Sequence, residues 1–400
     1  MTSSVLITVT GQDRPGVTGA LFAVLAAHDV EVVDVEQVVV RGLLTLGVLV
    51  TAPGPVDDGV LLDAAVHEAM DAAGMTVQVS TGSIARRADR RTTHVVVVLG
   101  RPLQARAVAA LAGAFGEAGV NIESIRRIAD HPVTGLELGV RAADEATLRA
   151  LVVRVAVQAG VDIAVERAGL ERRSKRLIVF DVDSTLITGE VIEMLADRTG
   201  HRAEVERITA AAMRGELDFE QSLRRRVALL AGLDAAVLDE VGAGLELTPG
   251  ARTTVRTLKR LGFRCGIVSG GFTQVTRHLV DDLALDFAAA NTLEVVDGRL
   301  TGRVVGEVID RAGKARALAR FAAESGVELS QTVAVGDGAN DIDMLAAAGL
   351  GIAFNAKPVV AEHADFALNQ PFLDPVLFIL GITRDEVEDA DQADGLVVAP

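Results

Sequence analysis

The sequence predicts an α/β protein with two small ferredoxin-like units followed by a doubly wound parallel sheet that carries a helical cap. Three observations lead to this prediction. Two stretches in the first half of the chain share one order of strands and helices. Residues 177–383 then alternate short apolar runs with helical segments, as buried parallel sheets do. Residues 191–246 interrupt that alternation with sequence that has helical spacing only.

The first unit is expected over residues 1–85. Its apolar runs and helical spacing give the order strand, helix, strand, strand, helix, strand, with a hairpin turn at Arg41 and Gly42. This βαββαβ order is that of the ferredoxin-like split βαβ unit. The six elements are expected at residues 5–10, 17–28, 31–40, 43–50, 58–73 and 75–80.

The second unit is expected over residues 93–170 and repeats the same order, displaced by about 90 residues. Two copies indicate a duplication, because solenoids use shorter and more numerous repeats. Short basic runs at 86–91 and 171–176 flank this unit, and we expect both to be solvated connectors. The elements of the second copy are expected at residues 94–100, 104–117, 120–128, 135–140, from 144 onward, and 161–167.

The third unit is expected over residues 177–383, with the inserted cap at 191–246. Its strands are nearly continuous apolar runs, so both faces of the sheet should be covered by helices. Residues 384–400 hold six acidic side chains and are expected to form a disordered acidic tail. The strands are expected at LIVF, RCGIVSG, QTVAVG, LGIAF and DFALN.

Composition excludes several classes of protein. The chain has 39 Lys and Arg against 55 Asp and Glu, a net charge of −16, and neither Trp nor Tyr. Nucleic-acid binding calls for clustered cations and stacking aromatics, so no nucleic-acid partner is expected. The single cysteine, Cys265, excludes an internal disulfide and a cysteine zinc site. No signal peptide and no apolar run of about 18 residues is present, so we expect a cytoplasmic protein without a membrane partner.

Polar clusters follow three of the predicted strands, where ligands of open α/β sheets bind. Asp181 and Asp183 come after the first strand, Ser269 and Gly270 after the second, and Asp337 after the third. Asn340, Asp341 and, at the start of a helix, Lys314 complete the set. Two carboxylates that converge on one spot are tolerated around a cation, and oxygen ligands suit Mg²⁺.

This set of motifs resembles the haloacid dehalogenase superfamily, whose patterns are DxDx[TV], Ser or Thr, Lys, and GDxxxD. The resemblance covers residues 177–345 and implies a haloacid dehalogenase-like core that uses Mg²⁺. It implies that Asp181 is the nucleophile and Asp183 the general acid and base. Lys314, Ser269 and Gly270 would hold phosphoryl oxygens. The metal would be bound by Asp181, Asp337 and the main-chain oxygen of Asp183.

Within that superfamily the chain is most similar to the phosphoserine phosphatases, through Glu190 and the cap signature from Phe219 to Arg226. The resemblance implies that Arg226 binds the serine carboxylate and Glu190 the ammonium group, while Met213 and Phe219 line the wall. Asn340 would contact the phosphate, and Asp341 would orient the lysine. A solvated helix face beside Arg224 and Arg225 is the alternative for Arg226.

The turn Asp13–Gly16 in VTGQDRPGV resembles that of the ACT domain, a module that binds amino acids between copies. The likeness implies two ACT domains, with Gly16 as a possible ligand contact and L-serine or another amino acid as regulatory ligand. It also implies a homodimer or a higher homo-oligomer. Gly16 as a plain turn residue stays open. The second copy has Arg101–Gln104 at this turn, without a glycine, so it is a weaker candidate for a ligand site.

The expected function is hydrolysis of O-phospho-L-serine through an aspartyl-phosphate intermediate, the last step of serine biosynthesis, with amino-acid feedback through the ACT domains. Two alternatives stay open. One keeps the mechanism but changes the substrate to phosphothreonine, another small phosphate or a phosphoprotein. The other is a non-catalytic amino-acid sensor, against which the intact set of Asp181, Asp183, Lys314 and Asp337 argues.

Overall fold

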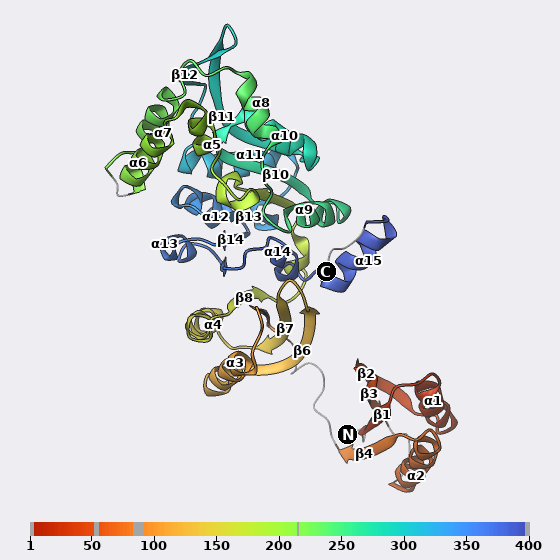
Figure 1. Ribbon diagram of the computed structural model, residues 1–400. Coiled ribbons are helices and arrows are strands. Elements are labelled where there is room, and N and C mark those ends of the chain that lie inside the picture. Colours follow the sequence, from red (N-terminus) through yellow and green to blue (C-terminus); the bar gives the residue numbers. More distant parts are fainter. Residues whose placement is uncertain (1–3, 52–55, 83–91, 214–215, 397–400) are drawn as a thin grey trace. The chain divides into compact units, whose positions relative to one another are not determined.

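The computed structural model describes residues 4–51, 56–82, 92–213 and 216–396, without the side chains of 56–59, 82 and 213. The chain divides into two compact units, Met1–Arg91 and Thr92–Pro400. Both contain mixed helices and strands, so the predicted α/β class is confirmed (Figure 1). Within the described residues, no helix is long and apolar enough to cross a membrane.

The first unit is the predicted βαββαβ fold. Its antiparallel sheet has the order β2-β3-β1-β4, and apolar side chains such as Ile7 and Leu21 are buried between the sheet and the two helices. Gly16 precedes α1 with a φ of 97°, a left-handed conformation that favours glycine. The elements are β1 (Ser4–Gln12), α1 (Val17–Ala27), β2 (Glu31–Val40), β3 (Leu43–Thr51), α2 (Val56–Ala72) and β4 (Thr76–Gly82).

The second copy opens the other compact unit and has the matching sheet order β6-β7-β5-β8. Asp144 caps α4 by accepting a hydrogen bond from the Thr147 amide, which explains why that helix begins there. Alternate residues of β5 divide between two cores, because side chains alternate across a strand. Val96 and Val98 pack against helices of the same copy, whereas Val97 and Leu99 join the core of the third unit. The elements are β5 (His94–Gly100), α3 (Ala105–Glu117), β6 (Asn121–Ala129), β7 (Thr134–Arg141), α4 (Glu145–Ala159) and β8 (Asp162–Arg167).

The third unit contains a seven-stranded sheet of order β12-β11-β10-β9-β13-β14-β15. All neighbouring pairs are parallel except β11 with β12. Helices lie on both faces of the sheet, as predicted (Figure 1). The strands are β9 (Leu177–Phe180), β10 (Arg264–Phe272), β11 (Phe287–Val296), β12 (Arg299–Val305), β13 (Thr332–Gly336), β14 (Leu350–Phe354) and β15 (Phe366–Leu368). The helices of this sheet are α9 (Ala251–Arg260), α10 (Thr273–Asp282), α11 (Arg311–Glu324), α12 (Ile342–Ala347), α13 (Pro358–Ala361) and α14 (Pro375–Ile379).

The hairpin of β11 and β12 was not expected from the sequence. Its first strand begins with FAAAN, whose three alanines have low β propensity, and its second holds four polar or glycine positions. The hairpin is stabilised by packing instead of by β propensity, because Leu293 and Leu300 are buried in the main core. The hairpin extends the sheet by an antiparallel edge.

The cap is helical, as predicted. Among the cap residues that the structure describes there are four helices, of which α7 packs against β12 and α8 packs against α10. The cap helices are α5 (Val191–Thr199), α6 (Arg202–Met213), α7 (Phe219–Ala228) and α8 (Ala236–Ala243).

The expectation of disorder from residue 384 onward is wrong for the residues that the structure describes. Residues Arg384–Ala393 form α15, which begins at a capping box between Thr383 and Glu386. The acidic side chains do not all face solvent, because Asp391 is 3% exposed and pairs with Arg256 and Arg260 on α9. Residues 397–400 lie outside the described residues.

The connector at 171–176 differs from expectation in part: Arg173 and Arg176 are exposed as predicted, but two other basic residues anchor it. Arg172 donates to Glu137 and Glu166 of the second copy and to the Ile379 carbonyl beyond the sheet. Lys175 is buried and donates to two further carbonyls. The connector at 86–91 lies outside the described residues.

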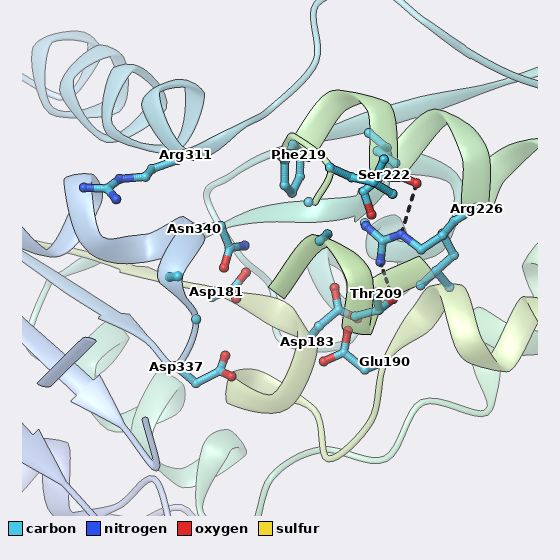
Figure 2. A pocket seen from close by; sticks show the side chains of 18 residues that line it. Asp181, Asp183, Glu190, Thr209, Phe219, Ser222, Arg226, Arg311, Asp337 and Asn340 are labelled. Carbon is cyan, nitrogen blue, oxygen red and sulfur yellow. Dashed lines mark hydrogen bonds between the residues drawn. The ribbon is translucent and has the colours of Figure 1, made fainter. Parts of the chain in front are cut away.

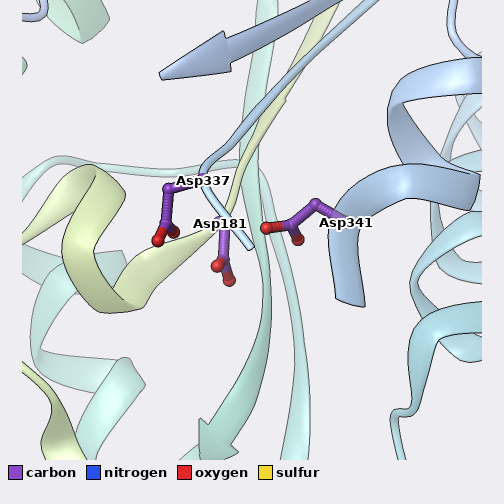
Figure 3. A group of neighbouring side chains, drawn as sticks. All are labelled: Asp181, Asp337 and Asp341. Atoms are coloured by element: carbon purple, nitrogen blue, oxygen red, sulfur yellow. The ribbon is translucent and has the colours of Figure 1, made fainter. Parts of the chain in front are cut away.

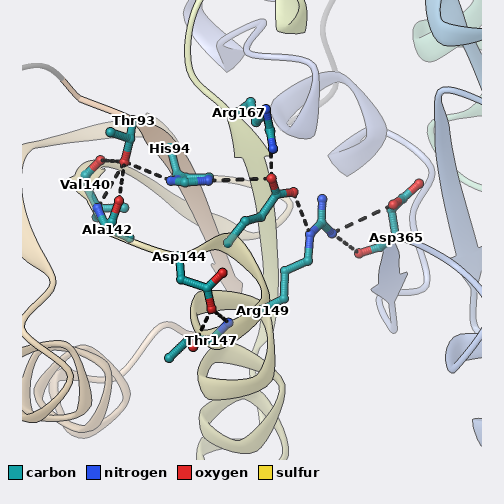
Figure 4. A network of polar contacts seen from close by, with 10 residues as sticks. Thr93, His94, Val140, Ala142, Asp144, Thr147, Arg149, Arg167 and Asp365 are labelled. Atoms are coloured by element: carbon teal, nitrogen blue, oxygen red, sulfur yellow. Dashed lines mark hydrogen bonds and ion pairs between the residues drawn. The ribbon is translucent and has the colours of Figure 1, made fainter.

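Further polar contacts join the second copy to the β15 side of the sheet. Asp162 accepts hydrogen bonds from Asn369 and Gln370. Arg149 reaches Asp365 and also pairs with Glu145, which His94 and Arg167 contact (Figure 4). The second copy and the sheet therefore share both an apolar core and a network of ion pairs.

Candidate active site

Three carboxylates gather at the carboxyl ends of two adjacent strands (Figure 3). Asp181 directly follows β9, Asp337 directly follows β13, and the Asp181 amide donates to the Val335 carbonyl at 2.8 Å. Asp341 lies four residues after Asp337, in the turn before α12. One oxygen from each carboxylate lies within 4.8 Å of the other two. Parallel pairing of β9 and β13 thus produces the cluster that the motifs predicted.

Lys314 supplies the positive charge inside this cluster. It is 0% exposed, and its Nζ lies 2.6 Å from an oxygen of Asp181 and 2.6 Å from one of Asp341. Burial lowers the pKa of Lys314, but the two carboxylates outweigh burial and raise it above its ordinary value. Burial and repulsion from Asp341 raise the pKa of Asp181 well above its ordinary value. One buried lysine does not neutralise three carboxylates, so the site has an excess of negative charge.

Asp183 lies in the turn after Asp181, where Ser184 adopts a left-handed φ of 57°. One oxygen of Asp183 accepts a hydrogen bond from the Val191 amide at 2.7 Å. The other is 3.4 Å from the Ser269 hydroxyl. Burial raises the pKa of Asp183, which favours its protonated form compared with a solvated carboxylate.

A cavity of about 410 Å³ lies between these carboxylates and the cap (Figure 2). Glu190 lines it and accepts a hydrogen bond from Ser184 at 2.9 Å. Burial, with repulsion from Asp183, raises the pKa of Glu190 to about 7. Arg226 lines it from α7, on the same side as Glu190 (Figure 2), and its two hydrogen bonds, to Thr209 and to the Ser222 carbonyl, are both long at 3.4 Å.

The cavity floor is built around the end of β10. Ser269 accepts from the Gly271 amide at 2.8 Å, and Asn291 donates to the Gly270 carbonyl at 2.8 Å. A side chain at Gly270 would lie 3.3 Å from the Phe219 ring, so glycine leaves space between floor and cap. Asn340 lines the cavity beside Asp337.

The comparisons with known proteins agree with this architecture. A family model described as haloacid dehalogenase-like hydrolase matches residues 178–346, and models described as ACT domain match residues 3–80 and 92–166. A phosphoserine phosphatase of Mycobacterium tuberculosis is 59% identical over 393 residues, 98% of this chain and 96% of the relative. The chain belongs to the phosphoserine phosphatase family.

Other relatives support the same membership. A phosphoserine phosphatase of Streptomyces coelicolor is 58% identical over 388 residues, 97% of this chain and 94% of the relative. Among solved structures, a probable phosphoserine phosphatase from Vibrio cholerae has a TM-score of 0.59 at 35% identity, covering 78% of this chain and 91% of its own. A haloacid dehalogenase family hydrolase from Salmonella enterica has a TM-score of 0.62 at 29% identity, and the match covers 72% of this chain and 98% of that protein's chain. The predictions of a haloacid dehalogenase-like hydrolase and of two ACT domains are confirmed.

The structure brings most of the predicted site residues together at one cavity. Ser269, Lys314 and Asp341 lie behind the lining and hold its carboxylates and main chain. The side chain of Met213 lies outside the described residues. Gly16 belongs to the other compact unit and precedes α1. The predicted residues that line the cavity are Asp181, Asp183, Glu190, Phe219, Arg226, Gly270, Asp337 and Asn340.

Some contributors were missed by sequence reasoning. Thr185 donates to Asp337 at 3.1 Å, and its place in the DVDST motif was the available signal. Asn291 accepts from the Ile309 amide and donates to Gly270, two contacts that depend on the unexpected hairpin. Thr209 and Ser222 line the cavity from the cap.

The donor set fits a divalent metal ion, which haloacid dehalogenase-like hydrolases use. Carboxylate oxygens are the ligands that hard divalent cations prefer. Both oxygens of Asp341 are used, one by Lys314 and the other by the Gly338 amide. Asp181 and Asp337 each use one oxygen in the contacts described above, so they are the carboxylates that can take the ion. Burial raises the pKa of Asp337 to about 6, and a bound cation would favour its charged form.

Proposed function

We propose that this protein is a Mg²⁺-dependent phosphatase that hydrolyses O-phospho-L-serine to L-serine and phosphate. One observation carries the proposal: a single cavity has the carboxylate cluster at one end and Glu190 with Arg226 at the other. The first end suits a phosphate, and the second suits an ammonium and a carboxylate. A phosphorylated amino acid carries all three groups.

In the first step, a carboxylate oxygen of Asp181 attacks phosphorus and the bond from phosphorus to the serine oxygen breaks. Asp183 gives its proton to the departing serine oxygen, consistent with the buried site that raises its pKa. The products of this step are free serine and an aspartyl-phosphate on Asp181.

In the second step, Asp183 takes a proton from water, whose oxygen attacks the same phosphorus. The bond to Asp181 breaks, phosphate leaves, and Asp183 is protonated again. Lys314 holds Asp181 at 2.6 Å throughout and offsets charge on the phosphoryl oxygens, assisted by Ser269, Gly270 and Asn340.

Mg²⁺ is the proposed ion, held by Asp181, Asp337 and the main-chain oxygen of Asp183. When bound, it neutralises phosphate charge so that an anionic nucleophile can approach. The all-oxygen donor set, with few protein carboxylates, matches the preference of Mg²⁺ for one or two carboxylates plus substrate phosphate.

Substrate selection falls to the cap. Arg226 presents a planar fork that fits a carboxylate, and its long contacts to Thr209 and Ser222 leave it available for a stronger partner. Glu190 is placed to bind the ammonium group, and an ammonium beside it would lower its raised pKa. Phe219 closes the wall over Gly270.

For the ACT domains we propose an amino-acid ligand, L-serine or another, that regulates turnover, with Gly16 as a contact in the first copy. We also propose that the protein is a homodimer or a higher homo-oligomer. The ACT family models support a regulatory role.

The deciding experiment measures phosphate release from O-phospho-L-serine, O-phospho-L-threonine and an aryl phosphate, with Mg²⁺ and with EDTA. Selective, EDTA-sensitive release from phosphoserine is the expected result. Equal release from all three would retain the aspartyl-phosphate chemistry but refute the assignment of substrate. Serine binding without any hydrolysis would instead favour an amino-acid sensor.

A further inference from the structure

Ser222 has a buried hydroxyl without a hydrogen-bond partner. The residue is 1% exposed, and its Oγ makes no hydrogen bond in the structure. A helical serine commonly bonds the carbonyl four residues back, but here only the Ser222 amide uses the Asp218 carbonyl. A buried unpaired hydroxyl is costly, and such a group in a native protein calls for an explanation.

The position of Ser222 explains why its hydroxyl has no partner within the protein. It lines the active-site cavity and lies one turn before Arg226 on α7, so the two side chains occupy the same face of the helix. Figure 2 shows the Ser222 side chain beside that of Arg226, whose Nε donates to the Ser222 carbonyl at 3.4 Å. Its immediate neighbour is therefore a cation with hydrogen-bond donors, which offers the hydroxyl hydrogen no acceptor.

We infer that Ser222 is a substrate-binding residue whose hydroxyl donates a hydrogen bond to the same carboxylate that Arg226 binds. The inference rests on the proposed function. A carboxylate accepts about four hydrogen bonds, so a guanidinium fork leaves capacity for a further donor. A neutral hydroxyl adds this contact without adding a positive charge that would compete for Glu190.

The test compares two substrates that differ in this carboxylate alone. O-phosphoethanolamine has the phosphate and the ammonium of O-phospho-L-serine but no carboxylate. For Ser222→Ala we expect kcat/KM on phosphoserine to fall about tenfold, chiefly through KM, as loss of a hydrogen bond to a charged group predicts. On phosphoethanolamine, kcat/KM should stay within about twofold of wild type, with the inhibition constant measured where turnover is slow.

Two further variants serve as controls for the loss of a buried hydroxyl. Thr254→Val removes another buried, unpartnered hydroxyl, on α9 and away from the cavity, and should leave both substrates unchanged. Ser222→Cys keeps the shape but donates weakly, and should lose phosphoserine selectively as the alanine variant does. Because each change removes an unpaired polar group, the melting temperature of all three should equal or exceed that of wild type.

The possible outcomes distinguish a failure of this inference from a failure of the proposed function. A wild type that hydrolyses phosphoserine, with Ser222→Ala unchanged on both substrates, would overturn the role of Ser222 alone. An equal loss on both substrates would also overturn it, because it would show a general effect on the cap. A wild type that hydrolyses no phosphoserine would refute the proposed function and this assignment with it.

Discussion

Replacing Asp181 by asparagine tests the nucleophile and the electrostatics of its cluster together. The change keeps the size and one carbonyl oxygen of the side chain but removes the negative charge. Turnover should fall below a few percent of wild type, because a neutral amide is not a nucleophile toward phosphorus. The stability of the metal-free protein should hardly change, and the distances in the structure say why.

At an effective dielectric constant of about 20, like charges no more than 4.8 Å apart repel by at least about 3.5 kcal/mol, and opposite charges 2.6 Å apart attract by about 6 kcal/mol. The Asp181→Asn variant would be relieved of the repulsions from Asp337 and Asp341, which together amount to at least about 7 kcal/mol. It would lose one attraction, to Lys314, of about 6 kcal/mol. The two effects nearly cancel, and Lys314 keeps Asp341 as a partner.

The assay is thermal unfolding in EDTA, with phosphate release measured on the same preparations. A shift in melting temperature within about 4 °C is expected, since 1 kcal/mol moves a domain of this size by a few degrees. Added Mg²⁺ should stabilise wild type more than the variant, which lacks one ligand. Residual turnover above a few percent would show that the nucleophile is misassigned. A large loss of stability in EDTA would refute the charge balance.

Other parts of the structure support three more predictions. Arg226→Lys should lower kcat/KM for phosphoserine about 10- to 100-fold, measured by phosphate release, because lysine lacks the planar fork. Asp391→Asn should lower the free energy of unfolding by about 2 kcal/mol at pH 7, since the carboxylate pairs with Arg256 and Arg260. Burial alone would raise the pKa of Asp391, but these arginines hold it below its ordinary value of 3.8, so the deficit measured by urea unfolding should shrink as pH falls below about 4. Light scattering should give at least a dimer, with and without serine.

Each of these predictions has a result that would contradict it. For Arg226→Lys it is an equal loss on O-phosphoethanolamine, which has no carboxylate for the fork to bind. A deficit for Asp391→Asn that is the same at pH 3 and pH 7 would show that the ion pairs do not anchor α15. A monomer by light scattering in both conditions would refute the proposed assembly.

The catalytic motifs could be predicted from the sequence because each is local. Asp181 and Asp183 share one turn, and Asp337 and Asp341 share another. Parallel pairing of the preceding strands then brings the turns together, a rule that needs no knowledge of side-chain packing. For Arg226, packing favours the cavity over a solvated helix face, since Arg226 lines the cavity while Arg224 and Arg225 are exposed.

What the sequence did not reveal depends on contacts between distant segments. Asp391 carries a charge in an acidic run, and its arginine partners lie more than a hundred residues earlier in the chain. Their ion pairs help to pack that run as a helix, together with the buried Val387. Arg172 lies in a basic run that is typical of a connector, yet Glu137 and Glu166 bury it. In both cases composition described the charge correctly but not the partner that neutralises it.

The shared core of the second ACT domain and the catalytic sheet determines where this chain can be cut without exposing apolar surface. A truncation that starts at residue 177 would leave Phe366 and Phe372 without the apolar residues of β5 and β6 that they share a core with. It would also uncover β15, an edge strand with unpaired main-chain groups that invites aggregation. A truncation that starts at residue 92 keeps β5 and β6, so the shared core stays covered. Removing the first ACT domain alone would therefore test whether that domain regulates turnover, in a fragment that keeps the shared core intact.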